Sequence, residues 1–352
     1  ISNEWDSEQV QEWGLDIPDF ASDEVSEAEK DEISKKLSDR FIIPPFSVLD
    51  TKQGIWQQRK NYWLSLGIKS EIGRESMALN FSSNIKNTAV VSGDGLNWKE
   101  STKDMVSKIA GKSNGVSIFD PVLCELSYKW FNIPKGKILD PFAGGSVRGI
   151  VASKLGYEYL GNDLRSEQIE ANRINAKEVL QDAELYPNWT SGDSLQIDSI
   201  AKGYEADMIF SCPPYADLEV YSDLNEDISN MSYKDFIFVY REIIRKSCDL
   251  LKNDRFAVFV VGDVRDKNGF YQNFVSDTIQ SFIDSGLMIY NEMILLNSLG
   301  NAGMRASKTF NGGRKVIKVH QNVLVFYKGN PKKIKENYPE LDLSYMKEDI
   351  ED

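Results

Sequence analysis

Residues 137–163 constrain the fold more than any other stretch of this sequence. Their apolar start predicts a short buried strand, the glycines predict a tight turn, and the residues from Ser146 onward predict a helix that leads into a second strand ending at Asp163. Because glycine has no Cβ, Gly144 and Gly145 allow positive φ and a close backbone approach to a ligand. An acid at the end of the second strand can bind a ribose diol. The segment therefore predicts a site for a nucleoside-containing cofactor.

A second motif narrows this prediction, because a glycine-rich turn by itself is also typical of dehydrogenases or of a plain strand-to-helix connection. The loop Asp140-Pro-Phe-Ala-Gly-Gly-Ser146 resembles the D-P-F-x-G-S/G-G/S cofactor loop of the S-adenosylmethionine-dependent amino-methyltransferases that modify DNA bases. Residues 207–215, which end in Cys212-Pro-Pro-Tyr215, resemble the catalytic strand and the (D/N/S)-P-P-(Y/F/W) tetrad of that family. The pair of motifs is more specific than either one alone.

This resemblance implies an α/β, class I (Rossmann-like) methyltransferase fold with seven mostly parallel strands and an antiparallel C-terminal hairpin. Helical and strand patterns alternate after the second motif, which also favours a doubly wound sheet. The expected helices are 167–180, 233–251 and 271–285, and the expected strands are 255–262, 287–296 and 320–327.

Composition excludes several classes of protein. No run of eighteen apolar residues and no basic-then-apolar N-terminus occurs, which predicts a cytoplasmic protein that does not enter membranes. The three cysteines lack paired metal-ligand spacing and His320 is the single histidine, so we expect no zinc site and no His-based triad.

The net charge of −13 is concentrated at the ends of the chain. Residues 1–40 hold thirteen acidic against four basic side chains, and residues 331–352 hold seven against four, so the region between them is nearly neutral. We expect an acidic arm or linker at 1–40, an accessory segment at 41–117, a catalytic domain at 118–330 and an acidic tail at 331–352. The arm resembles the stretch that follows a ParB-like domain in phage and prophage methylases, which implies an upstream ParB-like domain; a solvated linker is the alternative.

Two segments are candidates for DNA contact. In the first segment, helical spacing separates Trp56, Arg59, Lys60 and Trp63. These side chains could bind phosphates and stack on bases. Alternatively, the tryptophans could pack the helix onto the main domain while the cations face water. Residues 82–116 predict a long surface loop. The basic loop 297–318 has five cations and no acid, which favours phosphate contact. Its cations are Arg305, Lys308, Arg314, Lys315 and Lys318.

The resemblance also supplies the remaining cofactor residues. Phe119 and Asp120 occupy the place of the helix that covers the methionine end of the cofactor in this family, although Asp120 before Pro121 could simply cap that helix. Asp193 corresponds to the acid that accepts from the adenine amino group, or caps a turn. The full predicted set is Phe119, Asp120, Asp140, Pro141, Phe142, Gly144, Gly145, Ser146, Asp163, Asp193 and Ser211.

The predicted catalytic residues are Cys212, Pro213, Pro214 and Tyr215. An exocyclic amine is a poor nucleophile, so the enzyme must flip the base and make the amine more electron-rich. The resemblance implies that the first side chain of the tetrad and the Pro213 carbonyl accept the amine hydrogens, while Tyr215 stacks on the base. Cys212 departs from the family pattern because a thiol is a weak acceptor. Ser211, Asp217 and Glu219 are the nearest substitutes, and the cysteine precedes the prolines, which disfavours cytosine-5 chemistry.

The leading hypothesis is a DNA amino-methyltransferase that uses S-adenosylmethionine, releases S-adenosylhomocysteine and acts on adenine N6, or on cytosine N4, in a phage or restriction-modification setting. Methylation of an RNA base is the second hypothesis, because RNA guanine methylases share a P-P-Y tetrad. A weakened module that binds DNA and cofactor without catalysis is the third, and the Cys212 departure is its main support.

Overall fold

The computed structural model describes residues 43–69, 119–181, 183–215, 224, 226–297 and 302–341. Several sequence-based predictions lie outside these residues. They are the acidic arm at 1–40, the surface loop at 82–116, the two substitute acids Asp217 and Glu219, and the acidic tail from residue 342 onward.

Eight strands form one mixed sheet. They are β1 (Val48–Asp50), β2 (Lys137–Asp140), β3 (Glu158–Asp163), β4 (Asn188–Ser191), β5 (Ala206–Ser211), β6 (Leu251–Val261), β7 (Met288–Leu296) and β8 (His320–Lys328). Their order across the sheet is β1-β7-β8-β6-β5-β2-β3-β4, and only β8 runs antiparallel to its neighbours. The predicted class I α/β fold is therefore confirmed, with its antiparallel pair at the C-terminal end of the core.

The predicted count of seven strands is wrong, because β1 adds an eighth strand at the edge of the sheet. Val48 pairs with Ile294 and Asp50 with Leu296, in parallel. Three residues are too few to produce a recognisable alternation, and Pro44-Pro45 just before them disfavours a strand. The sequence pattern could not reveal this pairing.

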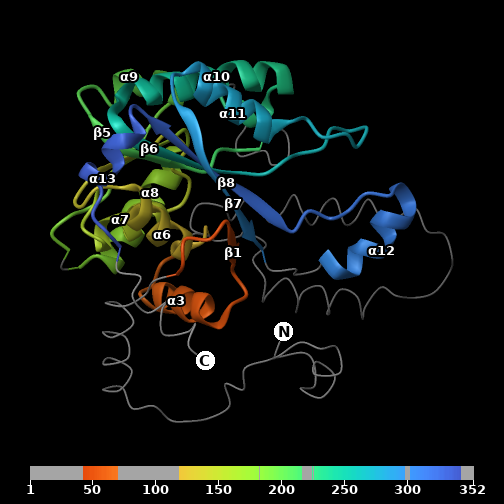
Figure 1. Cartoon of the computed structure of the whole chain (residues 1–352), viewed down its shortest axis with the longest axis horizontal. Helices are drawn as coiled ribbons and strands as arrows, with labels where there is room; N and C mark the ends of the chain where they lie inside the picture. The colour runs from red at the N-terminus through yellow and green to blue at the C-terminus, as the bar shows by residue number, and fades with distance from the viewer. Residues whose placement is uncertain are drawn as a thin grey trace, which may run out of the picture.

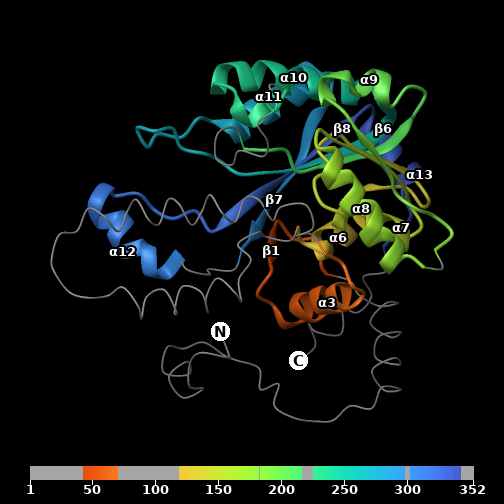
Figure 2. The same ribbon diagram turned by 180° about the vertical axis from the view of Figure 1, so that it is seen from behind.

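Helices cover both faces of the sheet (Figures 1 and 2). They are α3 (Gly54–Ser65), α6 (Pro121–Phe131), α7 (Val147–Lys154), α8 (Ser166–Val179), α9 (Ile197–Ile200), α10 (Tyr233–Leu250), α11 (Phe274–Asp284), α12 (Ala302–Gly313) and α13 (Ile334–Asn337), with short 3-10 turns at Ser194–Gln196, Ile228–Asn230 and Pro331–Lys333. Within the described ranges, none of these helices has the length and apolar character needed to cross a membrane.

Two hydrophobic cores lie on opposite faces of the sheet because successive strand residues point to opposite sides. In β6, Val258 packs with α6, α7 and α8, whereas its neighbours Ala257 and Phe259 pack with α9, α10 and α11. Figure 1 shows α9, α10 and α11 together on one side of the sheet and α6, α7 and α8 on the other. The result is a three-layer molecule in which the central strands are buried on both faces, whereas the first half of β7 is exposed.

Residues 43–69 pack against the main core. Trp56 and Trp63 of α3 are almost fully buried and belong to the same hydrophobic core as α6. At the other end, Ile334 and Tyr338 of the predicted acidic tail pack partly against this core as well. Both segments therefore contribute to the packing of the sheet's α6 face.

The predicted basic loop 297–318 is largely helical, because α12 occupies twelve of its residues. The helix contains Gly303, Gly312 and Gly313, although glycine is unfavourable within a helix. Figures 1 and 2 show α12 displaced from the sheet and from the helices that cover it, beyond the ends of β7 and β8. The prediction of a loop is wrong for residues 302–313.

The order of connections reverses between β2 and β5. The chain runs outward from β2 to β3 and β4 in one direction, and from β5 to β6 in the other. Ile138 and Leu139 of β2 pair with Met208 and Ile209 of β5. At such a reversal the loops that follow the two strands diverge and leave room for a ligand at the carboxyl edge of the sheet. Both sequence motifs follow these two strands.

Candidate cofactor and catalytic site

The first motif forms a turn between β2 and α7. Gly144 has φ of +52°, which an L side chain rarely adopts, so the predicted positive φ is confirmed there and does not occur at Gly145. The Ser146 hydroxyl lies 2.8 Å from Asn175 Oδ1 and is buried. It therefore attaches the turn to α8 and does not face a ligand. Phe142 stacks on Tyr240 with ring centroids 6.1 Å apart.

Asp140 lies beneath this turn, and its predicted direct role in cofactor binding is wrong. The side chain is fully buried, and its Oδ2 accepts from Arg148 Nε at 2.6 Å and from the Tyr159 hydroxyl at 2.7 Å. Its Oδ1 accepts from the Ser211 hydroxyl at 2.6 Å and from the Phe142 backbone NH at 3.1 Å. Asp140 thus fixes the turn from below by joining β2, β3, β5 and α7.

Arg148 completes this buried cluster. Burial alone would lower its pKa, but the Asp140 carboxylate raises it, and the net shift is upward, so the guanidinium stays charged. It also donates to the Phe142 carbonyl and lies 4.8 Å from the centre of the Phe119 ring. Phe119 makes an edge contact with Phe210 of β5. Phe119 is therefore held between β5 and α7, beside the turn, and its role as a wall of the cofactor site stays a prediction.

Asp120 is fully engaged by the protein, so the alternative prediction of a helix cap describes it better. Its Oδ1 accepts from the Val122 backbone NH at 2.9 Å at the start of α6. Its Oδ2 accepts from Trp56 Nε1 at 3.2 Å and lies 3.2 Å from Lys60 Nζ. Asp120 links α3 to α6 and does not face a cofactor.

Asp163 lies at the end of β3, where the sequence predicted a ribose-binding acid. Its Oδ2 accepts from the Gly144 backbone NH at 3.0 Å, and its Oδ1 accepts from the Arg165 backbone NH at 3.0 Å. Burial raises the pKa of Asp163 above its ordinary value, although Arg165 and the two backbone NH groups act in the opposite direction. The carboxylate is thereby aimed across the glycine turn.

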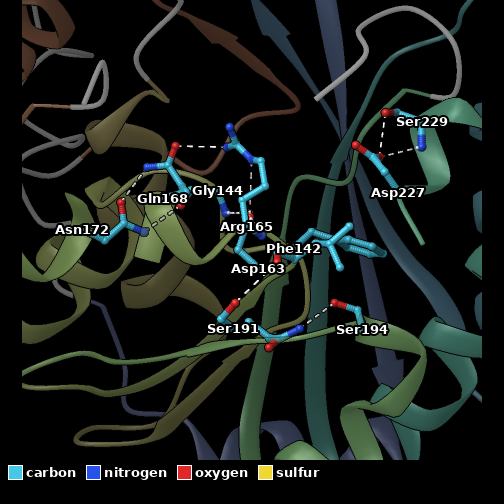
Figure 3. Close-up of polar contacts among 12 residues, drawn as sticks. Phe142, Gly144, Asp163, Arg165, Gln168, Asn172, Ser191, Ser194, Asp227 and Ser229 are labelled. Carbon is cyan, nitrogen blue, oxygen red and sulfur yellow. Dashed lines mark hydrogen bonds and ion pairs between the residues drawn. The ribbon is translucent and has the colours of Figure 1, made fainter. Parts of the chain in front are cut away.

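A closed ring of hydrogen bonds around the Gly144 peptide holds this arrangement, and Figure 3 shows its members. Arg165 donates to Gln168 Oε1 at 3.1 Å, Gln168 donates to Asn172 Oδ1 at 2.9 Å, and Asn172 donates to the Gly144 carbonyl at 2.7 Å. All three side chains are buried. Gln168 and Asn172 lie on one face of α8, and Arg165 immediately precedes that helix, so the three follow one another at spacings of three and four residues. This periodic run of polar side chains was the signal that could have identified them from sequence.

A second network joins the Gly192-Asp193-Ser194 turn to the cofactor loop. Buried Asn162 donates to the Gly192 carbonyl at 2.8 Å and lies 2.9 Å from Ser194 Oγ, and Ser194 donates to the Pro141 carbonyl at 2.5 Å. Asp193 Oδ1 accepts from the Leu195 backbone NH at 2.9 Å, as predicted for a capping residue. Sequence reasoning missed Asn162 and Ser194, although they hold three predicted cofactor segments together.

The second motif follows β5 on the other side of the reversal. Cys212 Sγ lies 3.6 Å from the Tyr215 hydroxyl, which accepts from Gln321 Nε2 at 2.6 Å and lies 3.5 Å from the Val260 carbonyl. The Tyr215 ring makes an edge contact with Phe274. Pro213 is buried and Pro214 is partly buried. These contacts fix the Tyr215 ring at the carboxyl edge of the sheet, against β6, β8 and the start of α11.

Ser211 cannot substitute for Cys212 as the polar acceptor. Its side chain is fully buried and its hydroxyl donates to Asp140 Oδ1. The prediction that Ser211 contacts the cofactor is wrong for the same reason. Ser211 instead ties the strand of the catalytic motif to the strand of the cofactor loop.

The structure contradicts the predicted DNA contact at Arg59. The Arg59 side chain is 3% exposed and donates through Nε to Glu125 Oε2 at 2.7 Å. Trp56, Arg59 and Trp63 share one face of α3, and this face packs on α6. Lys60 is paired with Asp120 and is partly exposed. The tryptophans pack the helix onto the main domain, as one alternative predicted, but Arg59 does not face water.

The cations of the α12 region differ in their surroundings. Arg305, Lys308 and Arg314 are exposed, and none of them pairs with an acid in the part of the chain that the structure describes. Lys315 is partly exposed. Lys318 is already engaged, because its Nζ lies 3.0 Å from Asp263 Oδ2 and 3.0 Å from Asn322 Oδ1. Lys318 therefore anchors the start of β8 and offers less charge to a ligand than the other four.

Neither protein-family models nor curated protein sequences match this chain. Solved structures do resemble it. TrmN from Thermus thermophilus is 13% identical, over 63% of this chain and 53% of its own, with a TM-score of 0.41. A TehB-like SAM-dependent methyltransferase from Corynebacterium glutamicum is 19% identical, over 65% of this chain and 97% of its own, with a TM-score of 0.36. Magnesium protoporphyrin IX methyltransferase with bound SAM, from Synechocystis PCC 6803, is 13% identical, over 67% of this chain and 87% of its own, with a TM-score of 0.36.

Replacing Asp163 with alanine tests the ribose-binding role. The change removes a charged acceptor from the end of β3 and should weaken S-adenosylmethionine binding by about 1–3 kcal/mol. Calorimetric titration measures the affinity, and circular dichroism checks that the variant stays folded. An unchanged dissociation constant would show that Asp163 does not contact the cofactor.

The raised pKa of Asp163 gives this contact a pH dependence. As pH falls toward the ordinary aspartate range, Asp163 should take up a proton earlier than a solvated aspartate does, and cofactor affinity should fall with it. Asp163→Asn should bind weakly and lose this pH dependence. Titrations of both proteins across the acidic range make the comparison.

Proposed function

We propose that this protein is an S-adenosylmethionine-dependent methyltransferase that modifies an exocyclic amine of a DNA base, at adenine N6 in preference to cytosine N4. One observation carries the proposal. The glycine turn with Asp163 and the Cys212–Tyr215 motif emerge from adjacent parallel strands, β2 and β5, at the point where the sheet reverses its order. A cofactor site and a base site would therefore share one edge of the sheet.

The residues around the glycine turn fit the proposed cofactor. A backbone with φ of +52° at Gly144 leaves the approach to the turn free of a Cβ, and Asp163 supplies an acceptor beside it for a ribose diol. Asp193 keeps one carboxylate oxygen outside its capping bond and can accept from an adenine amine. Phe119 offers an apolar wall. When bound, S-adenosylmethionine would supply an electrophilic methyl group.

Residues of the second motif fit a flipped base. The hydroxyl of Tyr215 is held at the sheet edge by Gln321, so the ring is positioned before a base arrives. An aromatic ring held in this way can stack on an adenine or a cytosine, a contact worth about 1–3 kcal/mol. The Pro213 carbonyl is the proposed acceptor for one amine hydrogen, which would leave the nitrogen lone pair more available for attack.

The most informative experiment is to incubate the protein with S-adenosylmethionine carrying a tritiated methyl group and with duplex DNA, single-stranded DNA and RNA. We expect label in duplex DNA, and digestion should release labelled N6-methyladenosine or N4-methylcytosine as the deoxynucleoside. Label in RNA alone would replace the DNA proposal with RNA base methylation. DNA binding without any label would favour the weakened binding module.

The α12 cations are the proposed contacts to DNA phosphates. Replacing Arg305 with alanine should lower the slope of the logarithm of DNA affinity against the logarithm of salt concentration by roughly 0.9, the amount expected for one lost phosphate contact. Binding measured by fluorescence anisotropy at several salt concentrations gives the slope. Arg245→Ala is a matched control, because Arg245 is an exposed arginine on α10 that pairs with Glu242 and Asp249. Equal slopes for the two variants would place the DNA elsewhere.

Cys212, the residue at which the tetrad departs from the family pattern, can be tested by substitution. Cys212→Ser should keep or raise methylation, because a hydroxyl accepts a hydrogen bond better than a thiol and direct methyl transfer needs no thiolate. Initial rates with labelled cofactor measure this. An inactive serine variant, together with a covalent adduct between the wild-type protein and DNA containing 5-fluorocytosine, would show cytosine-5 chemistry instead.

A further inference from the structure

Residues 263–272 form a β-hairpin that projects beyond the sheet between β6 and α11, and we call it the β6–α11 hairpin. The backbones of Arg265 and Tyr271 form an antiparallel β-bridge. The Asp266 backbone NH donates to the Phe270 carbonyl at 2.8 Å, and the Gln272 backbone NH donates to the Val264 carbonyl at 3.0 Å. Figures 1 and 2 show it, in teal, extending to the same side of the molecule as α12.

An exposed aromatic ring stands at the end of this hairpin. Phe270 is 73% exposed, whereas the backbone around it is tightly held. Its NH donates to Asp266 Oδ1 at 2.8 Å, and Arg265 donates to the Gly269 carbonyl at 2.8 Å while its guanidinium lies 3.8 Å from the Tyr271 ring centre. A single exposed apolar side chain is common on protein surfaces. A fixed backbone that presents such a ring on a projection is a more specific feature.

The two chain ends of the hairpin lie next to Tyr215, the residue proposed to stack on a flipped nucleobase. The chain enters it after Gly262, whose position for a Cβ lies 3.8 Å from the Tyr215 ring. The chain leaves it through Phe274, whose ring contacts the Tyr215 ring with centroids 6.0 Å apart. Both ends of the hairpin therefore border the residue proposed to stack on a flipped base.

The hairpin also contacts the basic region. Gly269 has φ of +93°, and a Cβ there would overlap the Lys315 ammonium, so this cation lies against the hairpin turn. Lys318 pairs with Asp263 at the hairpin base. DNA phosphates held by the α12 region would thus bring the duplex past Phe270.

We propose that Phe270 is the wedge that enters the duplex and occupies the space left by the flipped base. This proposal rests on the proposed DNA-methylating function. An extrahelical base leaves an unstacked gap, and opening it costs a few kcal/mol. An apolar ring that fills the gap stacks on the neighbouring bases and offsets part of this cost. Phe270 keeps its ring in water in the free protein, so no rearrangement of the hairpin is needed to present it.

The test compares Phe270→Ala with the wild-type protein on two DNA substrates. Wild-type methylation of plasmid DNA first identifies the modified position. Oligonucleotide duplexes of that sequence are then made with the target base either paired or placed opposite an abasic nucleotide. On the paired duplex, kcat/KM should fall by about 10- to 100-fold, because the variant must open the stack without a replacement ring. On the duplex with the unpaired target, the loss should shrink to within about threefold, because little pairing remains to be broken.

Two further variants serve as controls. Phe238→Ala removes a phenylalanine of similar exposure, 72%, from α10, and should leave methylation of both duplexes unchanged. Phe270→Leu keeps an apolar side chain and should retain most of the activity on the paired duplex. Equal activity of Phe270→Ala and the wild type on the paired duplex would overturn the wedge, as would an equal loss on both duplexes. A wild-type protein that methylates no DNA would instead refute the proposed function itself.

Discussion

Replacing Asp140 with alanine should lower the free energy of unfolding by about 3–5 kcal/mol, the cost expected when one partner of a buried ion pair is removed. Arg148, whose side chain is 5% exposed, would keep its charge without the carboxylate that compensates it. The hydroxyls of Tyr159 and Ser211 would lose their acceptor as well. Chemical denaturation followed by circular dichroism measures the change. Cofactor affinity should fall too, because Asp140 supports the turn that contains Gly144.

A double variant separates the buried charge from the loss of packing. Asp140→Ala combined with Arg148→Met removes both charges and fills the space of the guanidinium stem with an apolar chain. It should be more stable than Asp140→Ala alone, because the uncompensated charge is gone. A double variant that is less stable than the single one would show that the ion pair is not the main contribution of Asp140.

Replacing Glu125 with alanine should cost a similar amount, about 3–5 kcal/mol, and should loosen α3 from the domain. The fully buried carboxylate of Glu125 accepts from Arg59 Nε at 2.7 Å and from Trp63 Nε1 at 2.7 Å, and Lys129 Nζ lies 2.8 Å away. Without it, Arg59 is left as a buried charge. Denaturant unfolding gives the magnitude, and tryptophan fluorescence reports on Trp63. Glu178→Ala is the control, because its pair with Lys69 is solvent-exposed and should contribute little to stability.

The Glu125 contribution should depend on pH in a defined direction. Burial raises the pKa of Glu125. The Arg59 hydrogen bond and the nearby Lys129 and Arg59 charges together lower this pKa by more than burial raises it, so the net shift is downward. A carboxylate with a lowered pKa in the folded state stabilises the protein above its unfolded-state pKa and loses that contribution as pH falls through the folded value. The stability difference between wild type and Glu125→Ala should therefore shrink in strong acid. A difference that grows there would contradict the pairing.

The sequence could predict the parts of the fold that follow from local patterns. The strand, turn and helix around Gly144 were predictable because a glycine that permits positive φ, a buried apolar run and an acid at a strand end each have local causes. The helices α10 and α11 and the strands β6, β7 and β8 followed from their periodicity, although some of their bounds differ from the predicted ones by a few residues. The three-residue strand β1 and the glycine-containing helix α12 lacked such a pattern, and tertiary contacts decide them.

The direction in which a polar side chain points was harder to predict. Asp140, Asp120 and Ser211 have the residue types of the expected site, yet all three bond to the protein, because burial requires a partner for every polar group. Arg59 could have been placed correctly, since it shares a helix face with Trp56 and Trp63. The buried network of Arg165, Gln168 and Asn172 leaves only a faint helical spacing in the sequence.

The small strand β1 also affects how the molecule behaves among copies of itself. Its pairing with residues 294–296 covers the backbone NH and carbonyl groups of β7, which would otherwise form an open edge of the sheet. Thr51, just after β1, adds a hydrogen bond to the Leu296 carbonyl at 2.6 Å. Open edges recruit strands from other chains and promote aggregation. Residues 43–51 therefore leave less of the β7 edge open to strands of other copies, and a shortened version should retain them.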